Sequence, residues 1–435
     1  MKFLVFSDDW GRHPSSCQHL IRQLLPEHQV TWVNTIGMRP PRLDLLTARR
    51  GAEKLAGWVR RERREVEFQV SGSKFQVPDS EVQVGSGAEQ DLVNGSSQLA
   101  SRNASDRSPS AAPTVIDAKM WPWMSRRWDR WLNQNLLAKQ LGDAADGAVA
   151  ITTIPIVADL IGRLPVKSWI YYCVDDFSVW PGLDGKTLGR LEDELIAKVD
   201  RTIAVSDHLI ESLVNRNCRA ELLTHGVDVE FWRSKTGLAA RESPSESQLG
   251  TWNLKLSTIN TPLILFWGVV DRRMNADWVL ALADSLDAGK ILLAGPQQDP
   301  DPRLLNHDRI ELPGSLPFEE LPKLARVADV LIMPYADLPV TRAMQPLKLK
   351  EYLATGKPVV VSPLPATEGW KAFLQVARDA GEFVEKVHAS LTDGAGDDTE
   401  EERGRELRKR LEAESWRAKS QRLLEWIEKP VGVGS

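Results

Sequence analysis

The chain has 435 residues, a length that suits two domains of about 150–200 residues each. Hydrophobic residues make up 42% and charged residues 26%, as in an ordinary soluble globular protein. The net charge of −5 leaves no overall basic surface for nucleic acid, so no nucleic-acid partner is expected.

Cysteine usage and targeting signals predict a cytoplasmic protein. Cys17, Cys173 and Cys218 are too few and too scattered for a disulfide framework or a metal cluster, which favours a reducing compartment. No apolar run approaches the about 20 residues of a membrane-spanning helix. The N-terminal MKFLVFS lacks the apolar stretch and cleavage site of a signal peptide, and we interpret it as a buried strand.

Residues 1–235 have the pattern of a doubly wound α/β domain. An apolar strand at Phe3–Phe6 leads through a loop into an amphipathic helix, and a second strand follows at 28–35. This order is the start of a Rossmann-like fold. Further strands are predicted at 147–154, 168–174 and 201–206, and a helix at 188–200.

Two polar stretches interrupt this alternation of strands and helices. Residues 71–113 contain ten serines, and their single aromatic residue is Phe75. Such a segment cannot bury enough apolar surface to offset chain entropy, so we predict a disordered insertion. Residues 236–260 are predicted to be the linker between the two halves.

Residues 261–390 repeat the α/β rhythm and predict a second Rossmann-like domain. Residues 391–435 begin as an acidic linker and continue as one long helix over 405–428, placed to pack back on the first domain. In the second domain we predict strands at 262–270, 289–296, 309–314, 329–335 and 357–362, and helices at 276–286 and 318–328.

The segment PLKLKEYLATGKPVVVS predicts a helix with Pro346 at its first position and Gly356 at its end. Lys348 then lies in the first turn, where free N–H groups and the helix dipole favour an anion. Glu351 lies three residues on, on the same face, where a carboxylate can accept sugar hydroxyls. The alternative is a solvated helix on which Lys348, Lys350 and Glu351 make weak surface pairs.

Several motifs of the second half resemble GT-B glycosyltransferases. They are ILFWGVVDRRMNADWVLALADS, KILLAGP, RIELPGSLPFEELPKLARVADVLIMPY and TRAMQPLKLKEYLATGKPVVVSPLP, within about 261–370. The closest resemblance is to the family 4-like group of bacterial exopolysaccharide and teichuronic acid synthesis. YYCVDDFS, DRTIAVSDHLIESL and LTHGVDVEFW extend it more weakly into the first half. The resemblance implies two Rossmann-like domains facing across a cleft.

The resemblance also implies a donor site. Glu351 matches the glutamate that binds the ribose of the donor nucleotide. Lys348 and Thr341, with the neighbouring Arg342, fall in the stretch that approaches the diphosphate. Gly268 matches the glycine after the first strand of the donor domain.

The sequence departs from the family pattern at two places. Many relatives carry a second glutamate eight residues before the first, where this chain has Ala343. Many also carry an Arg–Lys pair just after the glycine, and here only Arg272 or Arg273 can take that place. The acidic pairs at 8–9 and 175–176 lack the spacing of a metal-binding Asp-x-Asp motif. The resemblance implies a metal-independent enzyme, and we expect no metal or cofactor beyond the donor itself.

Asp175 and Asp176 follow a predicted strand and are candidate general bases. Adjacent carboxylates raise each other's pKa, and either can deprotonate an acceptor hydroxyl. The alternative is that one aspartate caps a turn or pairs with a basic residue. His13, in the loop after the first strand, is a second candidate base, with a purely structural role as its alternative.

The segment Trp121–Trp131 holds four tryptophans, the last two at helical spacing with Arg127 and Arg130 beside them. Tryptophan and arginine together suit a membrane interface, where a lipid-linked acceptor is presented. The alternative is a helix that packs its tryptophan face on the core.

Together these features predict a cytoplasmic, hexosyl-type glycosyltransferase, peripheral to the inner face of the membrane. It would move a sugar from a nucleotide diphosphate donor to a hydroxyl of a glycan or lipid-linked acceptor. The alternatives are a GT-B sugar-nucleotide epimerase and a catalytically inactive, nucleotide-sugar-binding subunit of a polysaccharide assembly complex. The donor, the acceptor, the anomeric outcome and the oligomeric state stay open.

Overall fold

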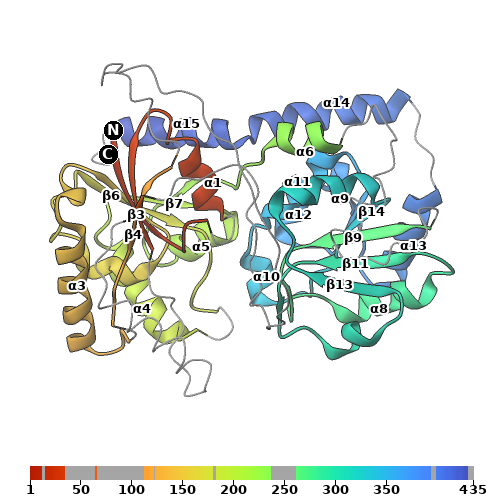
Figure 1. The fold of residues 1–435 in the computed structure, drawn as a ribbon, viewed down its shortest axis with the longest axis horizontal. Coiled ribbons are helices and arrows are strands. Elements are labelled where there is room, and N and C mark those ends of the chain that lie inside the picture. Colours follow the sequence, from red (N-terminus) through yellow and green to blue (C-terminus); the bar gives the residue numbers. More distant parts are fainter. Residues whose placement is uncertain are drawn as a thin grey trace, which may run out of the picture.

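The computed structural model contains two α/β domains that lie side by side, with a layer of helices crossing both (Figure 1). His13, almost all of the predicted insertion 71–113 and all but the first residue of the predicted linker 236–260 lie outside the described residues. The structure describes residues 1–11, 15–34, 64–65, 112–121, 123–179, 183–236, 261–392 and 398–429.

Within the described residues, the first domain has an eight-stranded sheet in the order β3-β4-β2-β1-β5-β6-β7-β8. All neighbouring strands are parallel except β3 and β4, which are antiparallel. The predicted strands are confirmed, because their apolar runs are buried on both faces. The strands are β1 (Lys2–Ser7), β2 (Gln29–Asn34), β3 (Arg64–Glu65), β4 (Thr114–Asp117), β5 (Val149–Thr152), β6 (Ser168–Cys173), β7 (Arg201–Ala204) and β8 (Glu221–Leu222).

Helices of the first domain begin at polar caps. The side chain of Ser15 accepts a hydrogen bond from the backbone of Gln18 at the start of α1, and Ser206 does the same for Leu209 at the start of α5. The helices are α1 (Ser16–Arg22), α3 (Arg127–Leu141), α4 (Gly185–Ile196) and α5 (Asp207–Val214).

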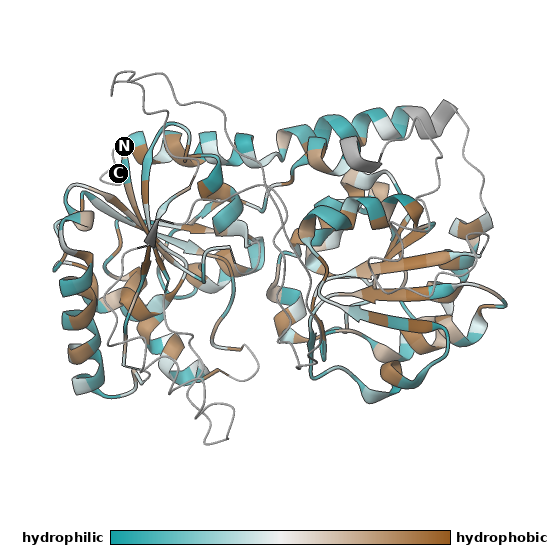
Figure 2. Cartoon of the chain, viewed as in Figure 1, coloured by the Kyte–Doolittle hydropathy of each residue, from teal (hydrophilic) through white to brown (hydrophobic). Residues whose placement is uncertain are grey.

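The second domain has a six-stranded, all-parallel sheet in the order β13-β11-β9-β14-β15-β16 within the described residues. Figure 2 shows that hydrophobic residues dominate its central strands. The strands are β9 (Leu263–Trp267), β11 (Lys290–Ala294), β13 (Ile310–Gly314), β14 (Val330–Met333), β15 (Val359–Val361) and β16 (Gln375–Val376), beside a short parallel pair, β10 (Val270–Asp271) and β12 (Gln297–Gln298).

Helix α11 matches the predicted helix with one shift. Pro346 is the N-cap and the helix begins at Leu347, one residue later than predicted. Gly356, at φ 74°, ends it as expected, because a left-handed residue is costly for any side chain with a Cβ. The helices are α6 (Val229–Thr236), α8 (Ala276–Ser285), α9 (Leu321–Val327), α10 (Pro339–Ala343), α11 (Leu347–Thr355), α12 (Pro365–Glu368) and α13 (Ala380–Thr392).

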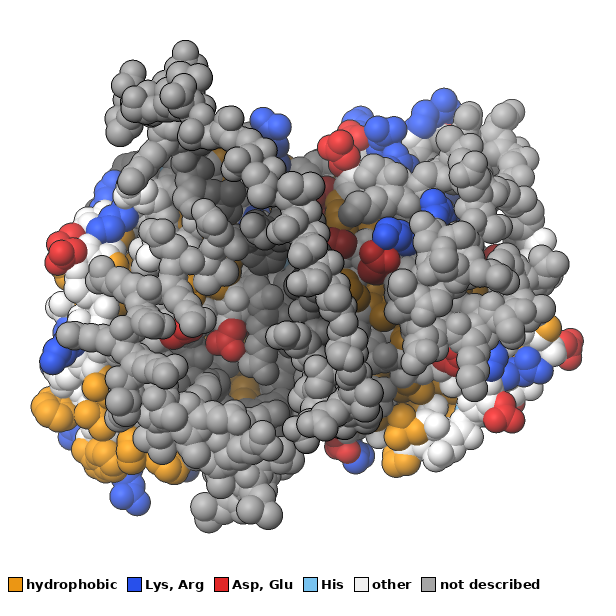
Figure 3. Space-filling model, viewed as in Figure 1, with side chains coloured by type: hydrophobic (Ala, Val, Ile, Leu, Met, Phe, Trp, Pro, Cys, Tyr) orange, Lys and Arg blue, Asp and Glu red, His pale blue; other side chains and the backbone are white. Residues whose placement is uncertain are grey.

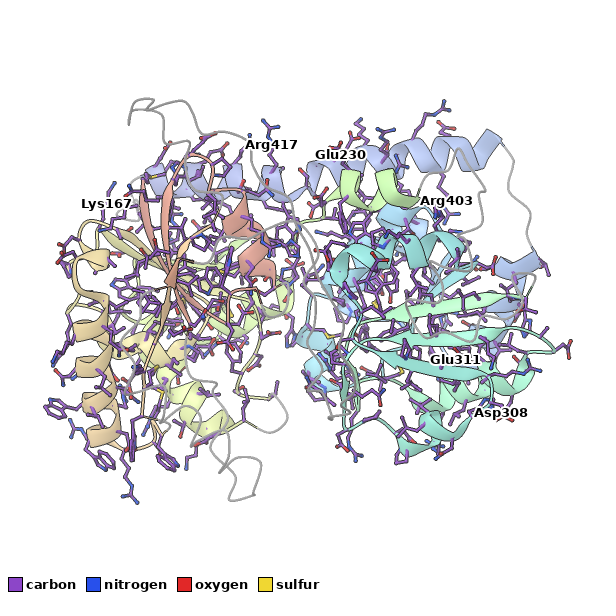
Figure 4. The ribbon with its side chains drawn as sticks, viewed as in Figure 1. Lys167, Glu230, Asp308, Glu311, Arg403 and Arg417 are labelled. Atoms are coloured by element: carbon purple, nitrogen blue, oxygen red, sulfur yellow. The ribbon has the colours of Figure 1, made fainter. Side chains whose placement is uncertain are left out.

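The prediction of one closing helix over 405–428 is wrong. The segment forms α14 (Asp398–Ala413) and α15 (Trp416–Glu428), because Ser415 is extended and its side chain caps α15. As Figure 1 shows, α14 lies over the second domain and α15 over the first. Arg417 points outward from α15 (Figure 4), whereas the neighbouring Trp416 is buried in the core of the first domain. No helix in the described parts of the chain combines the length and apolar character needed to cross a membrane.

Candidate functional site

The carboxyl edge of the second sheet is built from glycines. Gly268 follows β9, Gly295 follows β11 and Gly314 ends β13, with φ values of 136°, 151° and 81°. A Cβ on Gly295 would lie 1.9 Å from the carbonyl oxygen of Gly268. The backbones therefore approach each other more closely than side chains permit, which leaves bare peptide groups along this edge.

Helix α11 places the ammonium group of Lys348 over Gly268. Lys348 Nζ donates to Tyr335 Oη at 2.7 Å and lies 4.1 Å from the ring centre of Phe266. A Cβ on Gly268 would come within 1.9 Å of the same ammonium nitrogen. Because Gly268 has no side chain, Lys348 can hold a positive charge at the edge of the sheet.

Glu351 lies one turn further along α11 and is held by Trp267. The Trp267 Nε1–H donates to Glu351 Oε2 at 3.1 Å, and the Trp267 ring stacks on Trp232 with centres 5.1 Å apart. Burial raises the pKa of Glu351 to about 7, while the hydrogen bond from Trp267 and the charge of Lys348 oppose this rise. The carboxyl group is therefore oriented and changes its charge near neutral pH.

The interpretation of α11 as a solvated helix is wrong. Lys350 is only 2% exposed, and Lys348 and Glu351 are half-buried. Their contacts are to residues of other elements, so this helix is not a charged surface with weak pairs.

The two candidate arginines have different surroundings. Arg272 is exposed and pairs with Asp299, with Nε and Oδ2 2.6 Å apart. Arg273 is half-buried, pairs with Asp271 at 2.7 Å, and is close enough to Asp175 of the first domain to lower its pKa. Arg273 therefore faces the other domain, whereas Arg272 is held at the surface.

Thr341 and Arg342 also have different surroundings. The hydroxyl of the fully buried Thr341 donates within its own loop, to Ala336 O at 2.6 Å or Leu338 O at 2.9 Å. Arg342 is exposed and forms a two-pronged ion pair with Asp337, including an Nη2–Oδ2 distance of 2.6 Å. The Thr341 side chain thus shapes the loop before α11, and the Arg342 side chain lies at its surface.

Asp175 and Asp176 also have different surroundings. Asp176 Oδ1 accepts from the backbone and hydroxyl of Ser178 at 3.0 Å and 2.5 Å, which is the turn-capping role predicted as the alternative. Asp175 is half-buried, and burial raises its pKa to about 7, with Arg273 opposing and Asp176 adding to the rise. Of the two, Asp175 has the environment of a general base, since its pKa is close to neutral.

Asp8 holds the loop after β1 on the same edge as Asp175. Its carboxylate accepts from Ser15 Oγ at 3.1 Å and from Gln18 Nε2 at 3.1 Å, and Ser7 Oγ adds a third bond at 2.9 Å. Burial raises the pKa of Asp8, while these three side chains oppose the rise. Asp8 therefore ties the end of β1 to the start of α1.

The carboxyl edges of the two sheets face each other. Ser206 Oγ, after β7, donates to the carbonyl oxygen of Ala343, after β14, at 3.2 Å. The rings of His19 and Phe318 meet from the two domains with centres 5.8 Å apart. Together with the influence of Arg273 on Asp175, these contacts bring the two groups of candidate residues to one interdomain site.

Three of the four tryptophans in and before α3 do not pack on the core. Trp123, Trp128 and Trp131 are 43%, 50% and 61% exposed, so the core alternative is wrong for them, while Trp121 is half-buried. Figure 3 shows hydrophobic side chains gathered at the lower left, over one end of α3. Arg130 points inward instead and pairs with Asp159 at 2.6 Å, which anchors this helix.

Sequence analysis did not identify Trp267, Tyr335, Gly295 or Asp8 as parts of the site. Each ends an observed strand or follows it within two residues, at the carboxyl edge where parallel sheets bind ligands, and a position near the end of an apolar run was the available signal. The chemistry of their contacts depends on distant partners and carries no local signal. Across the described ranges, no three His, Cys, Asp or Glu side chains come together as a candidate metal site.

Comparisons with known proteins agree with this geometry. Residues 261–393 match the family model described as glycosyl transferases group 1. A candidate teichuronic acid biosynthesis glycosyltransferase, TuaH of Bacillus subtilis (strain 168), is 49% identical over 49 residues. That alignment covers 11% of this chain and 12% of TuaH.

Solved structures match over nearly the whole length. Sucrose-phosphate synthase from Thermosynechococcus elongatus has a TM-score of 0.61 and 14% identity, with 98% of each chain covered. HepE of Anabaena, in complex with UDP and glucose, has a TM-score of 0.58 and 12% identity, with 99% of this chain and 100% of HepE covered. The fold is GT-B, and the resemblance predicted from the motifs is confirmed.

Proposed function

We propose that the chain is a hexosyl-type glycosyltransferase of polysaccharide synthesis. It transfers a sugar from a nucleoside diphosphate donor to a hydroxyl of a glycan or lipid-linked acceptor. The observation that carries this proposal is the pair on α11: an ammonium group over a bare glycine edge, and an oriented carboxyl group one turn away. The match of residues 261–393 to group 1 glycosyl transferases supports the same assignment.

In this proposal the second domain binds the donor. Lys348 and Arg273 contact the diphosphate, which gains negative charge as its bond to the anomeric carbon breaks. Positive groups held in place, without a metal ion, stabilise that charge because they need no rearrangement during the reaction. Glu351 accepts hydrogen bonds from the ribose hydroxyls, and Gly268 leaves room for the phosphates. Thr341 holds the neighbouring loop in shape.

The first domain provides the acceptor side. The acceptor oxygen forms the new bond to the anomeric carbon, and Asp175 takes its proton. A carboxyl group with a pKa of about 7 is suited to this role, because it is partly ionised at neutral pH and basic enough to accept a proton.

The exposed tryptophans in and just before α3 serve, in this proposal, as a peripheral contact with an anionic membrane. Trp123, Trp128 and Trp131 are exposed, and so are the nearby side chains of Arg126 and Arg127, although the whole chain is acidic. Aromatic rings enter the interface of a bilayer, and cations bind its headgroups. This contact would bring a lipid-linked acceptor to the cleft.

Nucleotide titration and a donor panel test the proposal. Calorimetry with UDP, GDP and ADP is expected to give saturable binding of at least one, with UDP first because HepE was crystallised with it. Labelled nucleotide sugars are then expected to be hydrolysed slowly without acceptor, and transferred when a glycan or lipid-linked acceptor is added.

The remaining outcomes identify the alternatives. An isomerised sugar nucleotide without transfer indicates an epimerase. Binding without any turnover indicates an inactive subunit of an assembly complex. Absence of binding for all three nucleotides contradicts the donor site itself.

A further inference from the structure

Lys350 is the most deeply buried charged side chain of α11, and it lies between the two site residues Lys348 and Glu351. Its ammonium group donates to Thr224 Oγ1 at 3.1 Å, to the carbonyl oxygen of His225, and to Glu414 Oε2. An ammonium group has three N–H donors, so these contacts use all of them.

The three hydrogen-bond acceptors of Lys350 belong to parts of the chain that connect the domains. Thr224 and His225 follow β8, where the first domain ends, and Glu414 lies in the break between α14 and α15. The two segments are joined as well, because Val227 N donates to Glu414 O at 3.1 Å and Trp416 N donates to Val227 O at 3.3 Å. Lys350 thus ties α11 to the junction between these two segments.

A second lysine shares the same carboxylate. Lys419 Nζ donates to Glu414 Oε2 at 2.8 Å and to Thr224 Oγ1 at 2.9 Å. Burial would raise the pKa of Glu414, but Lys350 and Lys419 outweigh it and hold the pKa at about 2. Breaking one side of such a buried pair is costly, because a charge is then left without its partner.

The start of α11 has no side-chain cap. Its N-cap is Pro346, and no side-chain hydrogen bond caps its first turn. The first turn carries Lys348, and Glu351 is in the next. A helix that lacks a capping side chain needs tertiary contacts to fix its position.

We propose that Lys350 is a positioning residue for the donor site: by pinning α11 to the interdomain junction, it fixes Lys348 and Glu351 against the glycine edge. This inference rests on the proposed function, because it assumes that these two residues bind the donor. Lys350 does not touch the ligand in this arrangement.

Lys350→Met is the decisive variant, because methionine keeps most of the length and removes the three donors. Glu414 and Thr224 keep Lys419 as a partner, so no carboxylate is left alone. We expect the affinity for UDP to fall about tenfold, together with faster hydrogen exchange of the backbone amides of residues 347–355. Lys371→Met is the matched control, since Lys371 is exposed and pairs with Glu368 three residues before it; both measurements should stay at wild-type values.

Two further variants keep the test decisive if Lys350→Met does not fold. Thr224→Val and Glu414→Gln each remove one acceptor of Lys350 and should shift affinity and exchange in the same direction. Combined with Lys350→Met, Glu414→Gln should add less than its own separate effect, because both act through one contact. A folded variant with altered melting temperature but wild-type UDP affinity and exchange overturns the proposal. Failure of the wild type to bind UDP, GDP or ADP instead overturns the proposed function, and hydrogen exchange still reports on the pinning of α11.

Discussion

The two carboxyl edges that meet between the domains carry different chemistry. The edge of the second sheet consists of glycine backbone, an ammonium group and one oriented carboxyl group. The edge of the first sheet consists of carboxyl and hydroxyl groups, including Asp8, Ser7 and Thr153, which are bonded to one another. Bare peptide groups and a cation suit a ligand with a permanent negative charge, whereas carboxyl groups suit one that must lose a proton.

The difference between the two edges agrees with which parts of the chain match known proteins. The family match covers 261–393, which is the second domain, while the first domain is matched through its fold. In the proposed function, the second domain binds the diphosphate that nucleoside diphosphate sugars have in common, whereas the first domain faces acceptors that differ from one enzyme to another.

The largest effect is expected at Asp175, on the acceptor side. Asp175→Asn should lower turnover roughly 10²–10⁴-fold, because it removes the proton acceptor. Nucleotide affinity should stay unchanged. The wild-type rate should rise with pH through about 7, where Asp175 becomes ionised. Asp176→Asn is the control and should have a smaller effect, since Asp176 caps a turn; equal losses in both variants would contradict the division of roles.

On the donor side, Lys348→Ala should lower the rate by roughly 10²–10³-fold, more than it weakens nucleotide binding, because its charge acts most strongly on the leaving diphosphate. Glu351→Ala should instead act on affinity, at a cost of about 1.5–3 kcal/mol. Calorimetry beside a rate assay separates the two. If both variants bind nucleoside diphosphate like the wild type, α11 is not part of the donor site.

Gly268→Ala should weaken nucleotide binding by about 1–3 kcal/mol, because the new methyl group displaces Lys348 and strains a residue at positive φ. Gly142→Ala is the matched control: Gly142 also has positive φ, but nothing lies within 4 Å of the added Cβ. Both variants should lose some stability, measured by chemical denaturation. Only Gly268→Ala should lose nucleotide affinity.

Stability should fall as the pH rises from 6.5 to 8 in the absence of nucleotide. The pKa values of Asp175 and Glu351 are raised to about 7 in the folded state, so the folded state holds more protons than the unfolded state below that pH. The stability they contribute is complete below their ordinary values and is lost progressively as the pH rises from about 4 through about 7, so the window from 6.5 to 8 contains the last part of the loss. Glu351→Gln should reduce the loss in this window by about 0.8 kcal/mol in urea denaturation.

Between pH 6.5 and 8, stability is little affected by the other groups whose pKa values are shifted. Burial lowers the pKa of His19 to about 4 and that of His225 to about 3, so their effect on stability is confined to pH below about 6.5. Burial lowers the pKa of Lys350 to about 8, so its effect begins above that value. An unchanged pH profile in Glu351→Gln would show that Glu351 is not the group that titrates.

The smallest effect concerns the proposed membrane contact of the first domain. The double variant Trp128→Ala/Trp131→Ala should bind anionic vesicles roughly tenfold more weakly in liposome flotation, with turnover on a soluble acceptor unchanged. Val214→Ala, which removes another exposed apolar side chain of the same domain, should float like the wild type. Equal flotation of all three proteins, or none by any, would remove the membrane role.

The fold was largely predictable from local patterns. Runs such as FLVF and LILFW predict buried parallel strands because they are apolar throughout, and Gly356 predicts a helix end because of its backbone freedom. The break at Ser415 was not predictable in the same way. The helix-forming residues on both sides of it form a continuous pattern, and the break depends on Val227, which is distant in the sequence.

The site was predictable only where neighbours in sequence share a role. Lys348 and Glu351 were found because they lie three residues apart on one helix face. Three other features depend on how side chains meet in the folded protein. They are the hydrogen bond from Trp267 to Glu351, the hydrogen bond from the Thr341 hydroxyl to a nearby backbone carbonyl, and the burial of Lys350. No local pattern distinguishes a buried lysine with three partners from an exposed one.

The position of α15 determines the order in which the protein can be completed during synthesis. Trp416 and Leu423 belong to the hydrophobic core of the first domain, yet they follow the second domain in the chain. The first domain leaves the ribosome before the second but keeps an unfilled apolar groove until the second domain has been made. A chain that stops before Trp416 therefore leaves the first domain without the helix that completes its core.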